Sequence, residues 1–207
     1  MPSTQDVARK LPAGSVVVAD HQTAGRGRLA RSWQAPPGTA LLASFVLPPS
    51  PLLSLAVGVA AARACRPAVR LKWPNDLLLE GRKLGGILVE VHAGKAIVGV
   101  GINLSWAPAG GIALGEEREP LLERLRTELA RWATAPAADV LEAWRGLSDT
   151  LGREVRVELP SGPYEGLAQD VDPDGALVVS GRRVAAGDVI YLRAREDAAA
   201  PRPSGPE

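Results

Sequence analysis

Three arginines lie close together in residues 25–31 (GRGRLAR), and they are the first groups in the chain that suggest chemistry. Guanidinium groups bind phosphate or carboxylate oxygens in bidentate geometry, and glycines let the backbone approach a ligand closely. The segment follows Val16–Ala19, a β-branched run typical of a strand buried on both faces. Taken alone, it fits a solvated basic turn, or a contact to nucleic-acid phosphates, better than a binding site.

Two lysine-containing segments carry the next candidate groups. In residues 72–76 (KWPND), Lys72 and Asp76 flank a rigid Trp-Pro pair at the end of a predicted strand, where a sheet protein places functional groups. A turn of this composition also simply reverses a chain. Lys83 opens residues 83–90 (KLGGILVE), and because an unpaired buried ammonium is costly, it lies at the rim of a strand or against an anion. When this segment is judged alone, a position of Lys83 at the rim of the strand is favoured.

Alternating glycines in residues 99–104 (GVGINL) remove the side chains from one face of a predicted strand. This leaves room for a flat group, or for a closely crossing helix. Asn103, at the end of this strand, can both donate and accept a hydrogen bond. The two histidines and the single cysteine are isolated, so no zinc site and no cysteine nucleophile are predicted.

The overall composition limits the functional classes. The 207 residues include 24 Lys and Arg against 23 Asp and Glu, a net charge of +1 that lacks the basic excess of a dedicated nucleic-acid binder. One cysteine excludes an internal disulfide framework. No apolar stretch approaches the roughly 18 residues that a membrane span needs, and no signal peptide opens the chain. We therefore expect a cytoplasmic protein with no membrane partner.

These groups need a scaffold of strands and helices, and the hydrophobic periodicity predicts an α+β fold. Strands are predicted at residues 16–19, 39–47, 69–73, 77–79, 87–92 and 96–103, and helices at 3–10, 52–65, 118–133 and 139–147. Four or five short strands follow residue 151 and suggest a small SH3-like β-barrel. We therefore expect a larger domain at 1–150, an SH3-like domain at 151–195 and a disordered tail at 196–207.

Taken together and in this order, GRGRLAR, KWPND, KLGGILVE and GVGIN resemble the motifs of the bacterial biotin protein ligases, the biotin–[acetyl-CoA-carboxylase] ligases. The resemblance covers nearly the whole chain. It implies a mixed β-sheet with helices, similar to the catalytic core of class II aminoacyl-tRNA synthetases, followed by the SH3-like domain. It also implies the single-function type without a DNA-binding domain, acting as a monomer or homodimer.

The implied reaction has two steps. Biotin and ATP, with Mg²⁺, form biotinyl-5′-adenylate and pyrophosphate, and the biotinyl group then passes to a lysine of the biotin carboxyl carrier protein of acetyl-CoA carboxylase. Joining a carboxylate to a triphosphate brings two anions together, so such a site needs fixed cations. The resemblance implies that the protein does not bind DNA.

The resemblance also assigns roles to individual residues. Biotin binding falls to Ser3, Thr4, Gln5, Gln22, Gly25, Arg26, Gly27, Arg28 and Lys83. ATP binding falls to Arg28, Arg31, Trp33, Lys72, Asn75, Asp76, Lys83 and Asn103. The expected catalytic residues are Lys83, Arg28 and Asp76, and Asp76 also holds Mg²⁺ or accepts the proton of the acceptor lysine.

Two other interpretations stay open at this point. A lipoate or octanoate ligase or transferase resembles this fold and acts on a related carrier lysine, although GRGR and KWPND favour biotin. A nucleic-acid-binding module would use the basic loop and the barrel. The balanced charge and the lack of interleaved aromatic and basic residues oppose that second interpretation.

Overall fold

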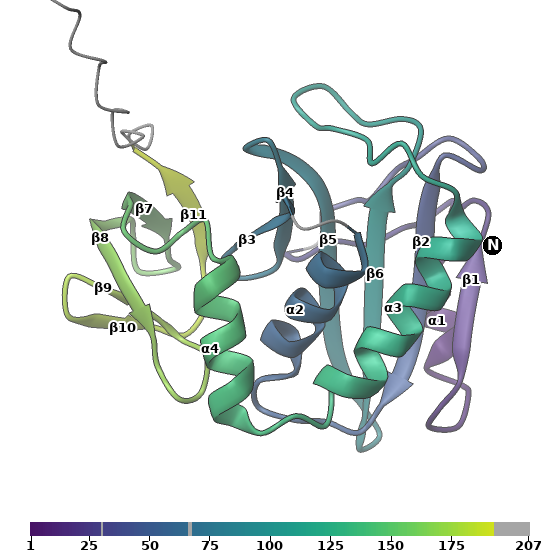
Figure 1. The fold of residues 1–207 in the computed structure, drawn as a ribbon, viewed down its shortest axis with the longest axis horizontal. Coiled ribbons are helices and arrows are strands. Elements are labelled where there is room, and N and C mark those ends of the chain that lie inside the picture. The colour runs from purple at the N-terminus through teal and green to yellow at the C-terminus, as the bar shows by residue number, and fades with distance from the viewer. Residues whose placement is uncertain (30, 66–67, 193–207) are drawn as a thin grey trace, which may run out of the picture.

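A computed structural model describes residues 1–29, 31–65 and 68–192 of the chain. It contains a six-stranded sheet with helices on both faces and a five-stranded sheet near the C-terminus (Figure 1). The α+β class is therefore confirmed. The expected disordered tail at 196–207, and residues 193–195 of the expected SH3-like domain, lie outside the described residues.

The larger sheet has the strand order β1-β2-β6-β5-β4-β3. Its strands are β1 (Val16–Ala19), β2 (Ala40–Leu47), β3 (Arg70–Lys72), β4 (Asp76–Leu79), β5 (Arg82–His92) and β6 (Lys95–Asn103). All neighbouring strands pair antiparallel, which corrects the expectation of mixed strand directions. Tight turns join β3 to β4, β4 to β5 and β5 to β6, and connections this short join only antiparallel neighbours.

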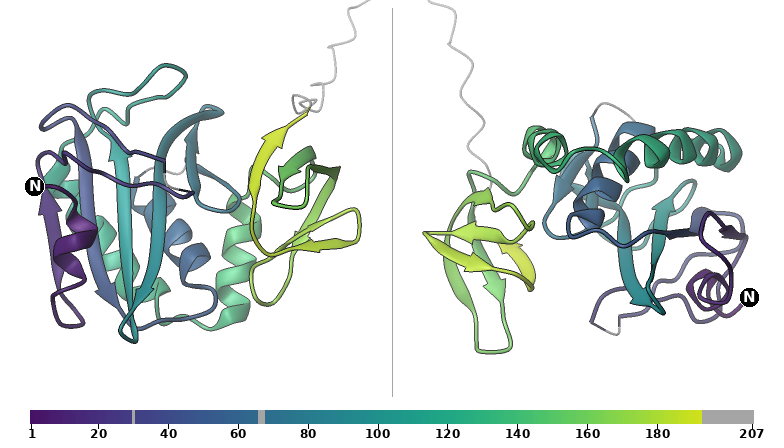
Figure 2. Two further views of the ribbon diagram at one scale, coloured as in Figure 1. Left: turned by 180° about the vertical axis from the view of Figure 1, so that it is seen from behind. Right: turned by 90° about the horizontal axis from the view of Figure 1, so that it is seen from below.

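Helices cover both faces of this sheet. α2 (Leu53–Cys65) and α3 (Arg118–Trp132) lie on one face, and the short α1 (Thr4–Ala8) lies on the other (Figure 2). α2 is rich in alanine and valine and is nearly all buried, because it lies between the sheet, α3 and α4 (Ala137–Leu147). Among the helices of the described residues, none combines the length and the apolar character needed to cross a bilayer.

Two strands differ from the sequence prediction in ways that matter for the site. β1 is an edge strand whose residues alternate between half-buried and buried, so it is not buried on both faces as expected. β5 begins at Arg82 rather than at residue 87, so Lys83 lies within a strand. Glycines follow Lys83, and their low strand propensity hid this start from sequence patterning.

The C-terminal unit is a five-stranded antiparallel sheet with the order β10-β9-β8-β7-β11. Its strands are β7 (Glu154–Glu158), β8 (Tyr164–Val171), β9 (Leu177–Val179), β10 (Arg182–Val184) and β11 (Asp188–Tyr191). This set of short strands agrees with the prediction. The sheet is open in the described part of the chain, however, since its edge strands β10 and β11 do not pair as a closed barrel requires.

Trp73, in the KWPND turn, connects the two sheets and is fully buried. Its ring nitrogen donates a hydrogen bond to the carbonyl oxygen of Gly175 at 3.0 Å. Its backbone N–H donates to Oγ1 of Thr150 at 2.9 Å. The tryptophan of this motif therefore fastens the C-terminal sheet to the larger one.

We expect Trp73→Phe to lower the free energy of unfolding by about 1–2 kcal/mol, because it removes the hydrogen bond to Gly175 from a buried ring. Denaturant titration measures this change. Trp106→Phe is the control, since Trp106 is 37% exposed and its substitution should cost less than about 0.5 kcal/mol. Equal losses in the two variants would contradict the role given to Trp73.

Candidate active site

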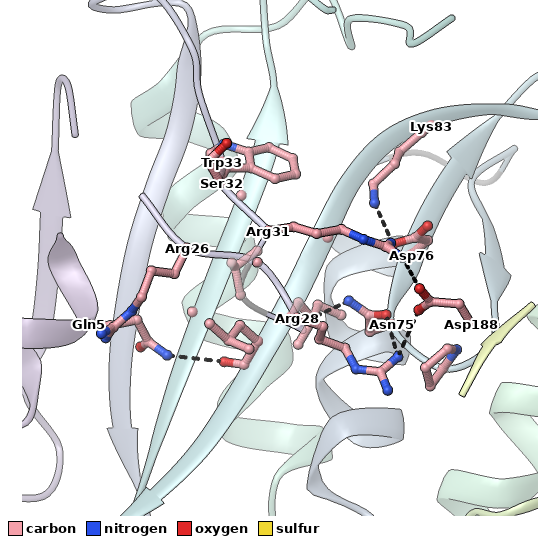
Figure 3. A pocket seen from close by; sticks show the side chains of 18 of the residues that line it. Gln5, Arg26, Arg28, Arg31, Ser32, Trp33, Asn75, Asp76, Lys83 and Asp188 are labelled. Carbon is pink, nitrogen blue, oxygen red and sulfur yellow. Dashed lines mark hydrogen bonds and ion pairs between the residues drawn. The ribbon is translucent and has the colours of Figure 1, made fainter. Parts of the chain in front are cut away.

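A cavity of about 310 Å³ lies on the face of the six-stranded sheet that carries α1 (Figure 3). Its walls come from α1, from the segment between β1 and β2, from the sheet itself and from β11 of the C-terminal sheet. Arg26, Gly27, Arg28 and Arg31 of the basic segment (GRGRLAR) meet the KWPND turn and Lys83 here. Segments that are far apart in the sequence therefore form one site.

Nearly all of the predicted site residues line this cavity. They are Ser3, Thr4, Gln5, Gln22, Arg26, Gly27, Arg28, Arg31, Trp33, Lys72, Asn75, Asp76 and Lys83. Gly25 does not line it, but lets two backbone segments approach, because a Cβ there would lie 2.3 Å from the carbonyl oxygen of Trp33. Asn103 is 2% exposed and donates from its side chain to the carbonyl oxygen of Ile112, so it fastens the segment after β6 instead.

Cationic side chains gather at one end of the cavity, on the right of Figure 3. Nζ of Lys83 lies 2.7 Å from Oδ1 of Asp76. Arg28 donates from Nη1 to Oδ1 of Asn75 and to the carbonyl oxygen of Gly187, both at 3.3 Å. Neighbouring polar groups therefore hold these cations in place.

Asp188, the first residue of β11, joins the C-terminal sheet to the basic segment. Its carboxylate accepts a hydrogen bond from Arg31 and lies 3.9 Å from Nη1 of Arg28. The sequence carries no local signal for this residue, because only the folded chain brings β11 to the cavity. The C-terminal sheet thus contributes a charged group to the site.

Burial changes the acid–base properties of two cations. It lowers the pKa of Arg28 below its usual value, against the attraction of Asp188 and Asp76. Burial also lowers the pKa of Lys72. The negative charge of Asp76 opposes this lowering, and the positive charge of Lys83 adds to it. A lowered pKa means that the charged form is less stable here than in water. Because a bound anion would restore that stability, this end of the cavity favours an anionic ligand.

Arg26 differs from the other two arginines of the basic segment. It points toward α1, on the left of Figure 3. Its Nη2 lies 2.8 Å from Oδ1 of Asp6 and 3.5 Å from Oε2 of Glu90. The three arginines that are close in sequence are therefore divided in space, because neighbouring carboxylates hold Arg26 away from Arg28 and Arg31.

The same end as Arg26 presents neutral polar groups from the start of α1. Ser3 caps the helix by accepting a hydrogen bond from the backbone N–H of Gln5 at 3.3 Å. Thr4 donates from its backbone N–H and its hydroxyl to Oε1 of Gln22, at 2.7 and 3.0 Å. Ser44 of β2, which was not predicted, donates to the Thr4 hydroxyl at 2.8 Å. A serine within an apolar strand was the available signal for it.

Gly101, one of the alternating glycines of β6, makes room for a flat group, as predicted, and that group is the indole of Trp33. A Cβ at Gly101 would lie 2.8 Å from Cε2 of this ring, and a Cβ at Gly86 of β5 would lie 3.5 Å from its Cζ3. Nε1 of Trp33 is buried and has no hydrogen-bond partner within the described ranges. The ring therefore keeps one donor for a ligand.

Comparison with known sequences decides the family. The profile of the biotin/lipoate A/B protein ligase family matches residues 2–106, about half of the chain. A biotin–[acetyl-CoA-carboxylase] ligase of Mycobacterium tuberculosis is 37% identical, over 87% of this chain and 80% of that protein. The chain belongs to this ligase family. The resemblance inferred from its motifs is thereby confirmed.

Further matches cover the rest of this ligase-family chain. The profile of the biotin protein ligase C-terminal domain matches residues 150–191, which contain the five-stranded sheet. A biotin–[acetyl-CoA-carboxylase] ligase of Paracoccus denitrificans is 33% identical, over 86% of this chain and 91% of that protein. The structure of the biotin protein ligase from Aquifex aeolicus in complex with biotin and ATP is similar, with a TM-score of 0.77. It is 26% identical and the match covers 93% of this chain and 95% of that one.

Proposed function

We propose that this chain joins biotin to ATP, giving biotinyl-5′-adenylate and pyrophosphate, and then transfers the biotinyl group to a lysine of the biotin carboxyl carrier protein of acetyl-CoA carboxylase. One observation carries the proposal: a single cavity has neutral hydrogen-bonding groups at one end and partly buried cations at the other. Biotin has the matching polarity, with a neutral ureido ring at one end and a carboxylate at the other. The similar Aquifex aeolicus structure, which contains biotin and ATP, supports the proposal.

Each end of the cavity takes one part of the reaction in this proposal. The proposed biotin-binding residues are Ser3, Thr4, Gln5, Gln22, Arg26, Gly27, Arg28 and Lys83, with Gly25 shaping the segment above them. The proposed ATP-binding residues are Arg28, Arg31, Trp33, Lys72, Asn75, Asp76 and Lys83. Asn103, which we expected near the nucleotide, is better assigned to holding the segment after β6.

In the first step, a carboxylate oxygen of biotin attacks the α-phosphorus of ATP, and the bond to the pyrophosphate oxygen breaks. Both reactants are anions, and negative charge builds on the phosphate oxygens in the transition state. Lys83 and Arg28 are placed to stabilise that charge. Because Asp76 and Asn75 already hold them, little reorganisation accompanies the reaction.

In the second step, the amine of the acceptor lysine attacks the acyl carbon of the adenylate, and AMP leaves. The attacking nitrogen must lose a proton to a base within hydrogen-bond reach. Asp76 is a carboxylate beside Lys83 at the cationic end of the cavity, so we assign this role to it. The acyl-adenylate hydrolyses in water, so we assign the exclusion of water to the basic segment that borders the cavity.

Asp76 is also the residue that would hold Mg²⁺. The described residues contain no group of three or more His, Cys, Asp or Glu side chains arranged to hold a metal ion. A nucleotide-bound Mg²⁺ needs only one or two protein carboxylates, because phosphates and waters complete its coordination. The position of Asp76 beside the cationic end fits that requirement. When bound, Mg²⁺ neutralises phosphate charge.

The lipoate or octanoate alternative is not favoured, because the C-terminal profile and the named relatives are those of biotin ligases.

We further propose that residues 1–150 form the biotin- and ATP-binding catalytic domain and residues 151–195 the SH3-like domain. We also propose a cytoplasmic location, where ATP and a carrier protein are available. The absence of DNA binding, and the state of a monomer or homodimer, stay predictions.

Biotin-dependent exchange of labelled pyrophosphate into ATP tests the first half-reaction. We expect exchange with biotin and none with lipoate. Exchange with lipoate alone would assign the chain to lipoate activation, and a folded chain inactive with both acids would refute the proposal. Mass spectrometry of a purified carrier protein tests the second step, where the expected result is one added biotinyl group on one lysine.

We expect Gly101→Val to raise the KM for ATP in this exchange assay about tenfold, because the valine side chain would displace the indole of Trp33 from the sheet. Gly146→Ala in α4 is the control, since a Cβ there meets no atom within 4 Å. Its KM should stay that of the unchanged chain. A normal KM in the Gly101→Val variant would remove Trp33 from the ATP-binding residues.

A further inference from the structure

Glu90, on β5, is a charged side chain that the proposed reaction does not use, and it is only 29% exposed. Its Oε2 accepts hydrogen bonds from Nε2 of Gln5 at 3.1 Å and from Nη2 of Arg26 at 3.5 Å. The same oxygen lies 3.0 Å from Nη2 of Arg9. One carboxylate oxygen therefore joins α1 to the basic segment beside the cavity.

These contacts determine which way the Gln5 amide points. Its Nε2 faces three oxygens, namely Oε2 of Glu90 and the carbonyl oxygens of Leu88 and Ile97, the last two at 3.4 Å. Turning the amide over would place its Oε1 against the same oxygens, one of them charged. Gln5 therefore directs its donors toward the protein.

The oxygen of the Gln5 amide is left for a ligand. Gln5 lines the cavity and is 4% exposed, and its Oε1 is buried with no hydrogen-bond partner among the residues described. A buried acceptor without a donor is costly, so a bound molecule with an N–H group would be stabilised here. Gly99 permits this arrangement, because a Cβ there would lie only 3.2 Å from Cδ of Gln5.

We propose that Glu90 is a positioning residue, which holds the Gln5 amide so that Oε1 accepts a hydrogen bond from a ureido N–H of biotin. This inference rests on the proposed function. Biotin carries two ureido N–H groups, whereas the dithiolane ring of lipoate carries none. A buried acceptor held in one orientation rejects a molecule that lacks the donor. Glu90 therefore affects whether the site selects biotin over lipoate, and not the reaction at the carboxylate of the substrate.

Glu90→Gln tests the proposal, because glutamine keeps the size of the side chain, removes its charge and adds an NH₂ group. The Gln5 amide can then turn over and present its own NH₂ group to the cavity. We expect the Kd of biotin, measured by calorimetry, to rise about tenfold, the loss of one buried hydrogen bond. The Kd of ATP, and kcat of exchange at saturating biotin, should stay within about twofold.

Two further variants separate positioning from a general effect on the fold. Asp6→Asn is the matched control, since Asp6 also pairs with Arg26 but is not among the partners of the Gln5 amide. Its biotin Kd should stay within about twofold. In a Gln5→Met background, which removes the amide, Glu90→Gln should cause no further loss of biotin affinity.

Three results would overturn the role of Glu90. They are an unchanged biotin Kd in Glu90→Gln, an equal further loss in the Gln5→Met background, and a joint loss of biotin and ATP binding with a lowered melting temperature. Where Glu90→Gln does not fold, Glu90→Ala, which also removes the carboxylate, is measured in the same way, and an unchanged biotin Kd again overturns the role. An unchanged chain that binds no biotin would refute the proposed function instead.

Discussion

Lys83→Ala lowers the rate of biotin-dependent pyrophosphate exchange by roughly 10²–10³-fold, the loss typical of removing one group that stabilises transition-state charge. Lys83 lies within β5, and Asp76 holds its Nζ at 2.7 Å at the cationic end of the cavity. An ammonium fixed there offsets the charge that builds on the α-phosphate, and alanine offers no replacement. Steady-state kinetics should therefore show kcat falling by more than KM rises.

The fold should survive this substitution, because the Lys83 side chain is 46% exposed. Lys10→Ala is the control, since Lys10 is an exposed lysine just after α1 that does not line the cavity. Its exchange rate should equal that of the unchanged chain. Full exchange activity in a folded Lys83→Ala variant would show that Lys83 is not a catalytic residue.

Arg28→Gly releases into solution a roughly 10- to 100-fold larger fraction of the biotinyl-adenylate that it forms than the unchanged chain does. Nη1 of Arg28 joins the basic segment to Asn75 and to the carbonyl oxygen of Gly187 in the C-terminal sheet. Hydrogen bonds to a charged group contribute about 1.5–3 kcal/mol. Their loss therefore makes opening of the basic segment roughly 10- to 100-fold more favourable. Chromatography of the free nucleotide after rapid quenching measures the release.

Leu29→Gly separates the loss of the guanidinium from the flexibility of a new glycine. Leu29 is the next residue, is 68% exposed and has a φ of +52°, which glycine adopts readily. We expect this variant to retain the adenylate. Equal release from both variants would assign the effect to backbone flexibility, and no release from Arg28→Gly would contradict the anchoring role of Arg28.

Local sequence patterns predicted most of the helices and strands, because the signals arise from neighbouring residues. The helix predicted at residues 3–10 contains α1, the apolar spacing of residues 52–65 matches α2, and alternating residues mark the short C-terminal strands. The patterns failed for the burial of β1 and for the open edge of the C-terminal sheet. Both depend on which strand lies alongside, and no short stretch of sequence contains that information.

The sequence by itself determined the family and most of the candidate site, since GRGRLAR, KWPND, KLGGILVE and GVGIN can be read without a fold. Only the tertiary structure decided where each of these groups lies in the cavity and which partners it contacts. It turns Arg26 toward Glu90, 64 positions away, and brings Asp188 to Arg31 across 157 positions. Such contacts are formed by the pairing and packing of whole sheets. The residues next to each partner in the sequence therefore do not predict them.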